Sequence, residues 1–194
     1  MNKGRLEAFS DGVFAIIITI MVLELRPPEG NSFSDLAPVL PKFISYILSF
    51  VYVAIYWNNH HHMFQVVKHV SGKVLWTNTF LLFCLSLVPF VTAWMGENHF
   101  NASPVALYGV VLIMAAIAYS ILVRSLIHLH GKNSLLATSI GGDFKGKISI
   151  VIYASGILLS FVNSFVGFAL YCLVACLWFI PDQRIEKNIK SEAE

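Results

Sequence analysis

The sequence predicts an all-α integral membrane protein, a single domain over residues 1–194 with six transmembrane helices per subunit. Three observations carry this prediction. Charged residues make up only 12% of the chain, hydrophobic residues make up 57%, and the mean hydropathy is +0.71. Soluble domains carry about 25% charged residues. The apolar residues also fall into six blocks, and Lys and Arg gather in alternate segments between those blocks.

Span lengths and helix-ending residues define the six blocks. About 20 helical residues cross the hydrocarbon core of a bilayer. Pro27 and Pro28 close the first span, Pro104 opens the fourth, and Pro89 is expected to kink the third. The last apolar block is too long for one crossing, and Asn163 divides it into a tight helical hairpin. The predicted spans are residues 6–25, 39–58, 74–95, 104–127, 147–162 and 165–181.

The distribution of basic residues predicts the orientation. Six crossings place both termini on one side, which receives 11 of the 13 Lys and Arg residues and leaves only Arg26 and Lys42 on the other. Because basic loops stay in the cytoplasm, we expect both termini to be cytoplasmic. Lys3 and Arg5 before an apolar run also resemble a signal peptide. Asp11 interrupts that run and no Ala-x-Ala-like site follows, which favours a retained first span.

The histidines and cysteines do not predict a metal site or a cofactor. Neighbouring side chains on a helix point about 100° apart, so the triplet His60–His62 cannot aim three rings at one ion. The other histidines are expected in loops and at helix ends. One or two of the triplet are instead expected to contact Asp11. Cys84, Cys172 and Cys176 lie in apolar runs and are expected to be free thiols.

Other chemistries lack support. Residues 141–147 approach a phosphate-binding loop, but Ile148 stands where a Ser or Thr is required and no strand precedes the segment, so we interpret it as a basic linker. The intramembrane serines lie in no G-x-S-x-G turn, and an enzyme is not predicted. Basic residues are spread over four cytoplasmic segments without interleaved aromatics, which argues against a nucleic-acid partner.

The first span is the candidate functional element. The charged residues expected deep in the membrane belong to this span: Asp11, with Glu24 near the far end. An ionisable group at membrane depth indicates a functional site. We therefore expect the other five helices to shield this helix from lipid and expect it to line a central path. One stripe of it, at i, i+3, i+4 and i+7, comprises Ile16, Thr19, Ile20 and Leu23. Such a stripe is also typical of ordinary packing or of a lipid-facing surface.

The pattern Arg5-x-x-x-Phe9-Ser10-Asp11 at the start of the first of six spans resembles the signature of the transmembrane protein 175 family of potassium channels, in its single-repeat prokaryotic form. Helix count, orientation and length extend the resemblance to the whole chain. It implies a homotetramer embedded in membrane lipid, with a pore lined by the first helix and no carbonyl selectivity filter.

The resemblance also implies two sets of site residues. The pore constriction would comprise Ile16, Thr19, Ile20 and Leu23. The structural polar network would comprise Arg5, Phe9, Ser10, Asp11, Trp57, His60, His61 and Asn78. Which of His60–His62 joins that network is left open by the sequence.

We therefore expect a potassium-preferring cation channel that passes K⁺ passively and needs no cofactor. Rings of isoleucine and leucine offer no oxygen to replace an ion's hydration shell, and such constrictions gate by dewetting. Thr19 supplies the polar side chain of the stripe, so a modest preference for potassium over sodium is expected. One alternative is a proton-coupled secondary transporter in which Asp11 titrates, although no inverted repeat is visible. Another is a membrane scaffold without transport.

Overall fold

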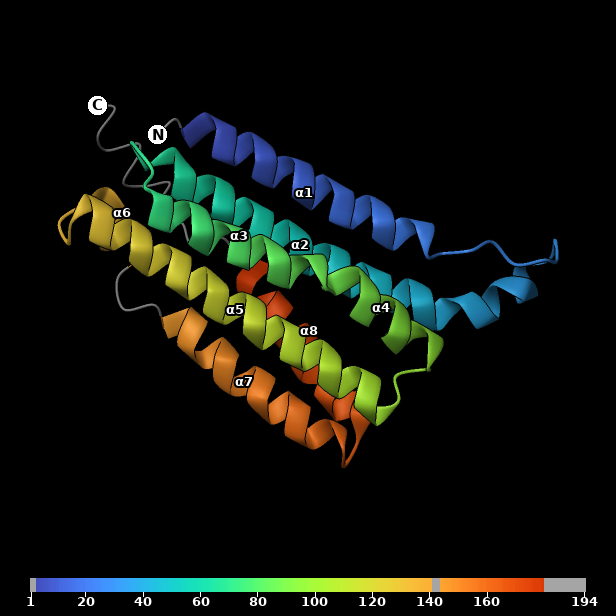
Figure 1. Ribbon diagram of the computed structural model, residues 1–194. Helices are drawn as coiled ribbons and strands as arrows, with labels where there is room; N and C mark the ends of the chain where they lie inside the picture. Colours follow the sequence, from blue (N-terminus) through green and yellow to red (C-terminus); the bar gives the residue numbers. More distant parts are fainter. Residues whose placement is uncertain (1–2, 141–143, 180–194) are drawn as a thin grey trace.

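The computed structural model describes residues 3–140 and 144–179, which form helices joined by loops (Figure 1). The order along the chain is α1 (Lys3–Leu23), the 3-10 helix η1 (Phe33–Val39), α2 (Leu40–Gln65), α3 (Gly72–Ser86), α4 (Val88–Glu97), α5 (Ala102–His130), α6 (Leu135–Ile140), α7 (Phe144–Ser160) and α8 (Ser164–Phe179). No strand occurs among these residues. The all-α prediction is confirmed.

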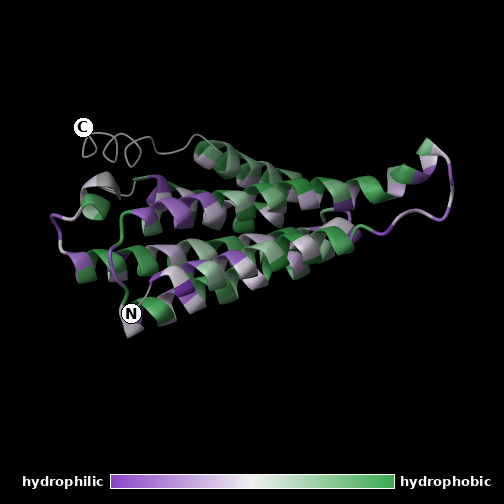
Figure 2. Ribbon diagram, turned by 90° about the horizontal axis from the view of Figure 1, so that it is seen from above, coloured by the Kyte–Doolittle hydropathy of each residue, from purple (hydrophilic) through white to green (hydrophobic). Residues whose placement is uncertain are grey.

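Four helical segments are long and apolar enough to cross a membrane. They are Lys3–Leu23, Phe33–Gln65, Gly72–Glu97 and Ala102–His130. The chain is therefore a multi-pass membrane protein by the length and composition of its helices. Figure 2 shows the hydrophobic residues along the lengths of the helices and the more hydrophilic ones toward their ends and in the loops.

The last two helices are shorter and form the expected hairpin. α7 has 17 residues and α8 has 16, which correspond to roughly 26 and 24 Å. In the turn between them the Asn163 side-chain oxygen accepts a hydrogen bond from the backbone N–H of Phe165 at 3.0 Å. Residues 180 and 181, the end of the predicted sixth span, lie outside the described residues. So do residues 141–143 of the segment that approaches a phosphate-binding loop.

The predicted third span is two helices. α3 ends at Ser86 and α4 begins at Val88, with Pro89 in the first turn of α4. Proline lacks a backbone N–H and its ring collides with the preceding turn, so the helical hydrogen bonds cannot continue through it. The expected kink at Pro89 is thus a break in the helix, with the N–H of Leu87 turning to the carbonyl of Cys84 at 3.3 Å.

Two other boundaries differ from the sequence prediction. α1 ends at Leu23, so Glu24 is an exposed turn residue outside the helix. α2 continues past the predicted end at residue 58 to Gln65, and the His60–His62 triplet is part of the helix. The buried side chains of Met63 and Phe64, 1% and 0% exposed, anchor this last polar stretch to the bundle. The short helix α6 was not expected within the linker that follows α5.

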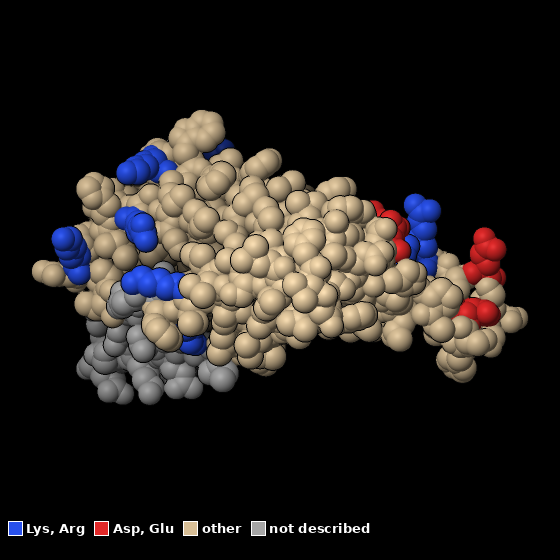
Figure 3. Space-filling view, turned by 90° about the horizontal axis from the view of Figure 1, so that it is seen from below, with Lys and Arg blue, Asp and Glu red and all other residues tan. Residues whose placement is uncertain are grey.

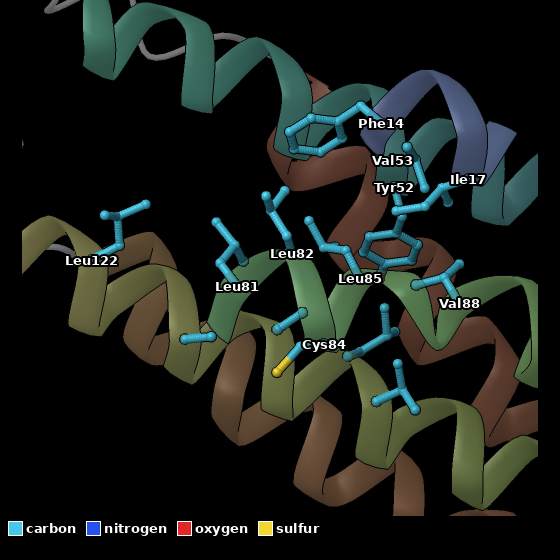
Figure 4. Packing of buried hydrophobic residues seen from close by; sticks show 14 of the residues in the cluster. Phe14, Ile17, Tyr52, Val53, Leu81, Leu82, Cys84, Leu85, Val88 and Leu122 are labelled. Carbon is cyan, nitrogen blue, oxygen red and sulfur yellow. The ribbon is translucent and has the colours of Figure 1, made fainter. Parts of the chain in front are cut away.

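α1 lies at the edge of the bundle, where it packs against α2, α3 and α4 (Figure 1). Its buried face recurs every three or four residues and comprises Leu6, Ser10, Phe14, Ile17 and Met21. Figure 4 shows Phe14 and Ile17 beside core side chains of α2 and α3, among them Val53 and Leu82. The expectation that five helices shield α1 is therefore wrong for a single chain, in which the opposite face of α1 stays open.

Close helix contacts and buried hydroxyls fix the rest of the bundle. Where α2 crosses α4, a side chain at Gly96 would place its Cβ 2.7 Å from the Cα of Lys42, so only glycine fits. Deeper in, the Ser49 hydroxyl lies 2.7 Å from the Thr92 hydroxyl and 3.0 Å from the Tyr108 hydroxyl. These hydrogen bonds join α2, α4 and α5, where no lipid could satisfy a polar group.

Charged side chains lie at the two ends of the bundle with an uncharged band between them (Figure 3). Basic residues gather at the end where α1 begins. Of the 11 basic residues expected on that side, Arg184, Lys187 and Lys190 lie outside the described residues. The other end carries Glu24, Glu29, Asp35 and Glu97 together with Arg26 and Lys42. There the Lys42 ammonium pairs with the Glu97 carboxylate at 3.0 Å and ties α2 to α4.

Candidate pore-lining face and polar network

The outward face of α1 holds all four residues of the predicted constriction. Ile16, Ile20 and Leu23 are 57%, 44% and 76% exposed. Thr19 lies on the same face, and its hydroxyl donates a hydrogen bond to the carbonyl of Ile16 at 2.9 Å. The hydroxyl oxygen keeps its lone pairs available on this face. Within one chain nothing among the described residues covers the stripe, so in the membrane it meets lipid, water or another helix.

The buried face of α1 is held by a hydrogen-bonded chain across three helices. The Ser10 hydroxyl donates to the carbonyl of Leu6 at 2.8 Å and accepts a hydrogen bond from the Asn78 amide nitrogen at 2.9 Å. The Asn78 amide oxygen lies 2.8 Å from Nε2 of His60. Because that oxygen can only accept, Nε2 of His60 carries the proton and donates it. α1, α2 and α3 each contribute one side chain.

This hydrogen-bonded chain of side chains is buried from solvent and tightly packed. Ser10, His60 and Asn78 are 0%, 1% and 2% exposed. The His60 ring contacts Phe14 edge-on, with ring centres 5.7 Å apart, and lies 4.6 Å from the ring of Phe64. Aromatic neighbours fix the plane of the imidazole, and the Asn78 oxygen fixes its tautomer. The cluster therefore positions α1 rigidly and offers no open site for a ligand.

A second contact lies nearer the surface. The Trp57 indole N–H donates to the Asp11 carboxylate at 3.0 Å, and its ring stacks on His61 with centres 5.8 Å apart. The Gln65 amide nitrogen, a donor, lies 2.9 Å from Nε2 of His61, so this nitrogen accepts. His60 and His61 thus carry their protons on different ring nitrogens. His60 and His61 therefore make their contacts on different faces of α2.

The remaining network candidates lie elsewhere. Arg5 is exposed and makes no hydrogen bond or ion pair within the described part of the chain, and Phe9 is 62% exposed on the outward face. His62 is half-buried, with its ring 5.9 Å from that of His61. The sequence reasoning missed Lys3, whose ammonium donates to the carbonyl of Phe64 at 2.8 Å. No sequence pattern could reveal this contact, because its acceptor is a backbone oxygen 61 residues away.

The described residues bring together no metal-binding cluster. Within residues 3–140 and 144–179, no three side chains of His, Cys, Asp or Glu gather to hold an ion. Cys84 is buried, Cys172 is half-buried and Cys176 is exposed, and all three are free thiols. The rings of His69 and His130 lie 4.7 Å apart, at the end of the bundle where α1 begins.

Comparison with known proteins identifies the family. A family model described as the endosomal/lysosomal potassium channel TMEM175 matches residues 5–89, which span α1 to the start of α4. A potassium channel of Chryseobacterium sp. (strain P1-3) is 58% identical over 190 residues, which cover 98% of this chain and 99% of that protein. The chain belongs to the TMEM175 family. It is thus a member of a channel family and not of an enzyme family.

Solved structures agree with this assignment. A crystal structure from Chamaesiphon minutus, of a homologue of the lysosomal potassium-selective channel TMEM175, superposes with a TM-score of 0.81 at 26% identity. The match covers 92% of this chain and 97% of that one. A variant of the potassium channel MtTMEM175 shares the fold, with a TM-score of 0.61 at 18% identity. A zebrafish TMEM175, named an endosomal/lysosomal proton channel, is 26% identical over 93% of this chain but only 36% of its own length. Members of the family therefore carry names for both potassium and proton conduction.

Proposed function

We propose that the chain is one subunit of a potassium-preferring cation channel whose pore is lined by α1. The observation that carries this proposal is the outward face of α1. Three helices fix the buried face of α1 through packing and the Ser10–Asn78–His60 chain, while Ile16, Thr19 and Leu23 face away from the bundle. A helix oriented this firmly, with one face left uncovered by its own chain, is suited to surround an axis together with other copies.

We infer a homotetramer of six-span subunits, with four copies of α1 around the pore. Ile16, Ile20 and Leu23 would then form apolar rings with the Thr19 hydroxyls between them. Apolar rings gate by dewetting and supply no carbonyl oxygens. Selectivity between K⁺ and Na⁺ would therefore be modest and would depend on Thr19. In this arrangement the six spans of residues 1–194 form one channel domain.

Charge at the pore mouth would favour cations. Glu24 follows Leu23 directly, and the same end of the bundle carries Glu29 and Asp35. Four copies would gather these carboxylates around the opening, which raises the local concentration of cations. The basic end of the bundle would face the cytoplasm, as the positive-inside rule requires, with both termini on that side of a bacterial plasma membrane.

The two polar contacts would have structural roles. Ser10, Asn78 and His60 hold α1 against its own bundle, and Asp11 with Trp57 and His61 fixes the flank of α1 near the basic end. Asp11 accepts from an indole at an exposed position, which favours a role in assembly over direct contact with the permeating ion. Arg5 and Phe9 lie on the open side of α1 and would meet neighbouring subunits.

Ion flux through purified protein in liposomes tests the proposal. Potassium and sodium gradients are run side by side, with protein-free liposomes as the control and size-exclusion chromatography to show that the protein is folded and assembled. Fast passive flux, larger for potassium, is expected. No flux from inserted, assembled protein would contradict the channel and favour a scaffold. Saturating, proton-coupled flux that is lost in Asp11→Asn would replace the channel with the secondary transporter.

A further inference from the structure

An open pocket lies inside the bundle on the far side of α2 from α1. The space between its walls, counted together with the solvent at its open mouth, is about 480 Å³, and α2, α5, α7 and α8 form the walls. Its principal wall residues are Tyr52, Tyr56, Asn59, Tyr119, Tyr153 and Trp178, and we call it the tyrosine pocket. Its position is toward the basic end of the bundle, because Gly146 and Ser149 of its wall lie in the first two turns of α7. Neither the outward face of α1 nor the Ser10–Asn78–His60 chain contributes to it.

The walls of the pocket are fixed by contacts of their own. The Tyr52 hydroxyl donates to the carbonyl of Tyr171 at 2.7 Å, and its ring centre lies 6.2 Å from that of Tyr153. The Trp178 indole N–H donates to the Ser149 hydroxyl at 2.9 Å. The rings of Tyr56 and Tyr119 meet edge-on at 6.1 Å. A preformed pocket of aromatic faces with a few hydroxyl and amide groups is typical of sites for small amphipathic ligands.

Among the described residues, the four helices that wall the pocket carry charge of one sign. α2, α5, α7 and α8 contain no Asp or Glu. The Lys145 ammonium lies 5.9 Å from the centre of the Trp178 ring, which is part of the wall. Arg124 lies one helical turn beyond Ser120 of the wall, and Lys147 lies between Gly146 and Ser149. The positive-inside rule accounts for basic residues at this end, but it does not account for an aromatic pocket directly inside them.

We propose that the tyrosine pocket binds an anionic phospholipid of the cytoplasmic leaflet. The phosphate would pair with Lys145 and its basic neighbours, and one acyl chain would lie among the tyrosine rings. Aromatic side chains with polar tips suit the depth at which headgroup meets hydrocarbon. A lipid seated there would contact the same helix that holds α1, because Tyr56 is adjacent to Trp57, which bonds to Asp11. The binding does not depend on whether the chain conducts ions.

Native mass spectrometry of the purified, assembled protein tests the proposal with phosphatidylglycerol and phosphatidylcholine supplied in equal amounts. Preferential retention of phosphatidylglycerol is expected. Lys145→Gln should reduce that preference by about fivefold, since one basic side chain near a membrane surface contributes about 1 kcal/mol toward anionic lipid. Lys132→Gln is the matched control: it removes the same charge from the turn between α5 and α6, outside the pocket, and should leave the preference unchanged.

A second pair of variants tests the place of the acyl chain. Ala116→Leu should fill the pocket from α5 and lower retention of phosphatidylglycerol, and Ser120→Leu should do the same if Ala116→Leu fails to assemble. Ala154→Leu adds the same bulk to an exposed position of α7 and should change nothing. Equal retention of both lipids by the unmodified protein, or equal losses in Lys145→Gln and Lys132→Gln, would overturn the proposal. Full retention in the filled variants would do so as well. Retention of added oleate in place of phosphatidylglycerol would assign the pocket to a free fatty acid instead.

Discussion

The Trp57 indole N–H and the Asp11 carboxylate meet at 3.0 Å across the contact of α1 and α2, although 46 residues separate them in the chain. The contact is exposed in the single subunit, unlike the buried chain of Ser10, Asn78 and His60 one helix face away. The basic end of α1 is therefore held by a contact in the core and a contact at the surface, in addition to the hydrogen bond from Lys3 to the carbonyl of Phe64. We expect the loss of the core contact and the loss of the surface contact to have different effects.

Removal of the buried amide should destabilise the fold. Asn78→Ala leaves the Nε2 proton of His60 without its acceptor in a site closed to water, which costs about 1–3 kcal/mol. Thermal unfolding of the purified protein in detergent measures the loss. Thr79→Ala is the matched control, because that hydroxyl is exposed and bonds to the carbonyl of Leu75 in its own helix. Equal unfolding temperatures for the two variants would show that the buried chain contributes no stability.

Removal of the charge at Asp11 should impair assembly more than permeation. Asp11→Asn keeps an acceptor for the Trp57 indole but replaces a charge-assisted hydrogen bond by a weaker neutral one. We expect a smaller fraction of assembled protein in size-exclusion chromatography and an unchanged ratio of potassium to sodium flux in the protein that does assemble. Trp57→Phe, which removes the donor from the other side, should have the same effect. Normal assembly with altered selectivity would place Asp11 in the ion path.

A polar residue at the proposed constriction should raise conductance and weaken selectivity. Leu23→Ser and Ile16→Ser each replace an apolar ring by hydroxyls that hold water in the pore, which removes a dewetted barrier. Flux in liposomes measures both effects. Leu158→Ser is the control, because Leu158 is 71% exposed on α7, close to the 76% of Leu23, but lies on a helix far from α1 in the chain. Unchanged flux in both α1 variants would remove α1 from the pore.

The hydroxyl of Thr19 should tune selectivity without deciding conduction. Thr19→Val keeps the shape of the side chain and removes its oxygen, so the ratio of potassium to sodium flux should fall by up to about fivefold, the effect of one hydrogen-bonding group worth about 1 kcal/mol. Thr79→Val, at an exposed threonine of α3, should leave the ratio as it is. A Thr19→Val channel with the original selectivity would show that Thr19 does not discriminate between the two ions.

Two glycines should respond to alanine with opposite sign. Gly96→Ala forces a Cβ to within 2.7 Å of the Cα of Lys42, and overpacking of this kind costs about 1–3 kcal/mol. Gly12→Ala meets nothing within 4 Å in its own chain and removes a flexible residue from the interior of α1, which gains about 1 kcal/mol. Thermal unfolding of the two variants compares them directly. A destabilised Gly12→Ala would show that a neighbouring subunit packs closely against that position.

The sequence by itself determined the class of protein, two of its helix boundaries and which residues of the first helix share a face. Low charge and long apolar blocks specify membrane helices because lipid cannot hydrogen-bond a polar side chain or an open backbone. Pro89 marks the break between α3 and α4, and Asn163 marks the hairpin, because each acts on the backbone beside it. The spacing of Ile16, Thr19, Ile20 and Leu23 places them on one face of any helix, and the structure places that face outward.

Only the tertiary structure decided which polar side chains meet. His60 and His61 are equivalent in sequence, but they point about 100° apart on one helix, so one enters the core toward Asn78 and the other stacks on Trp57. The end of α2 could not be predicted, because Met63 and Phe64 extend the helix through packing against distant residues. The same holds for α1, which the sequence placed at the centre of six helices. Within one chain it lies at the edge, because three helices suffice to bury its inner face and leave its outer face open.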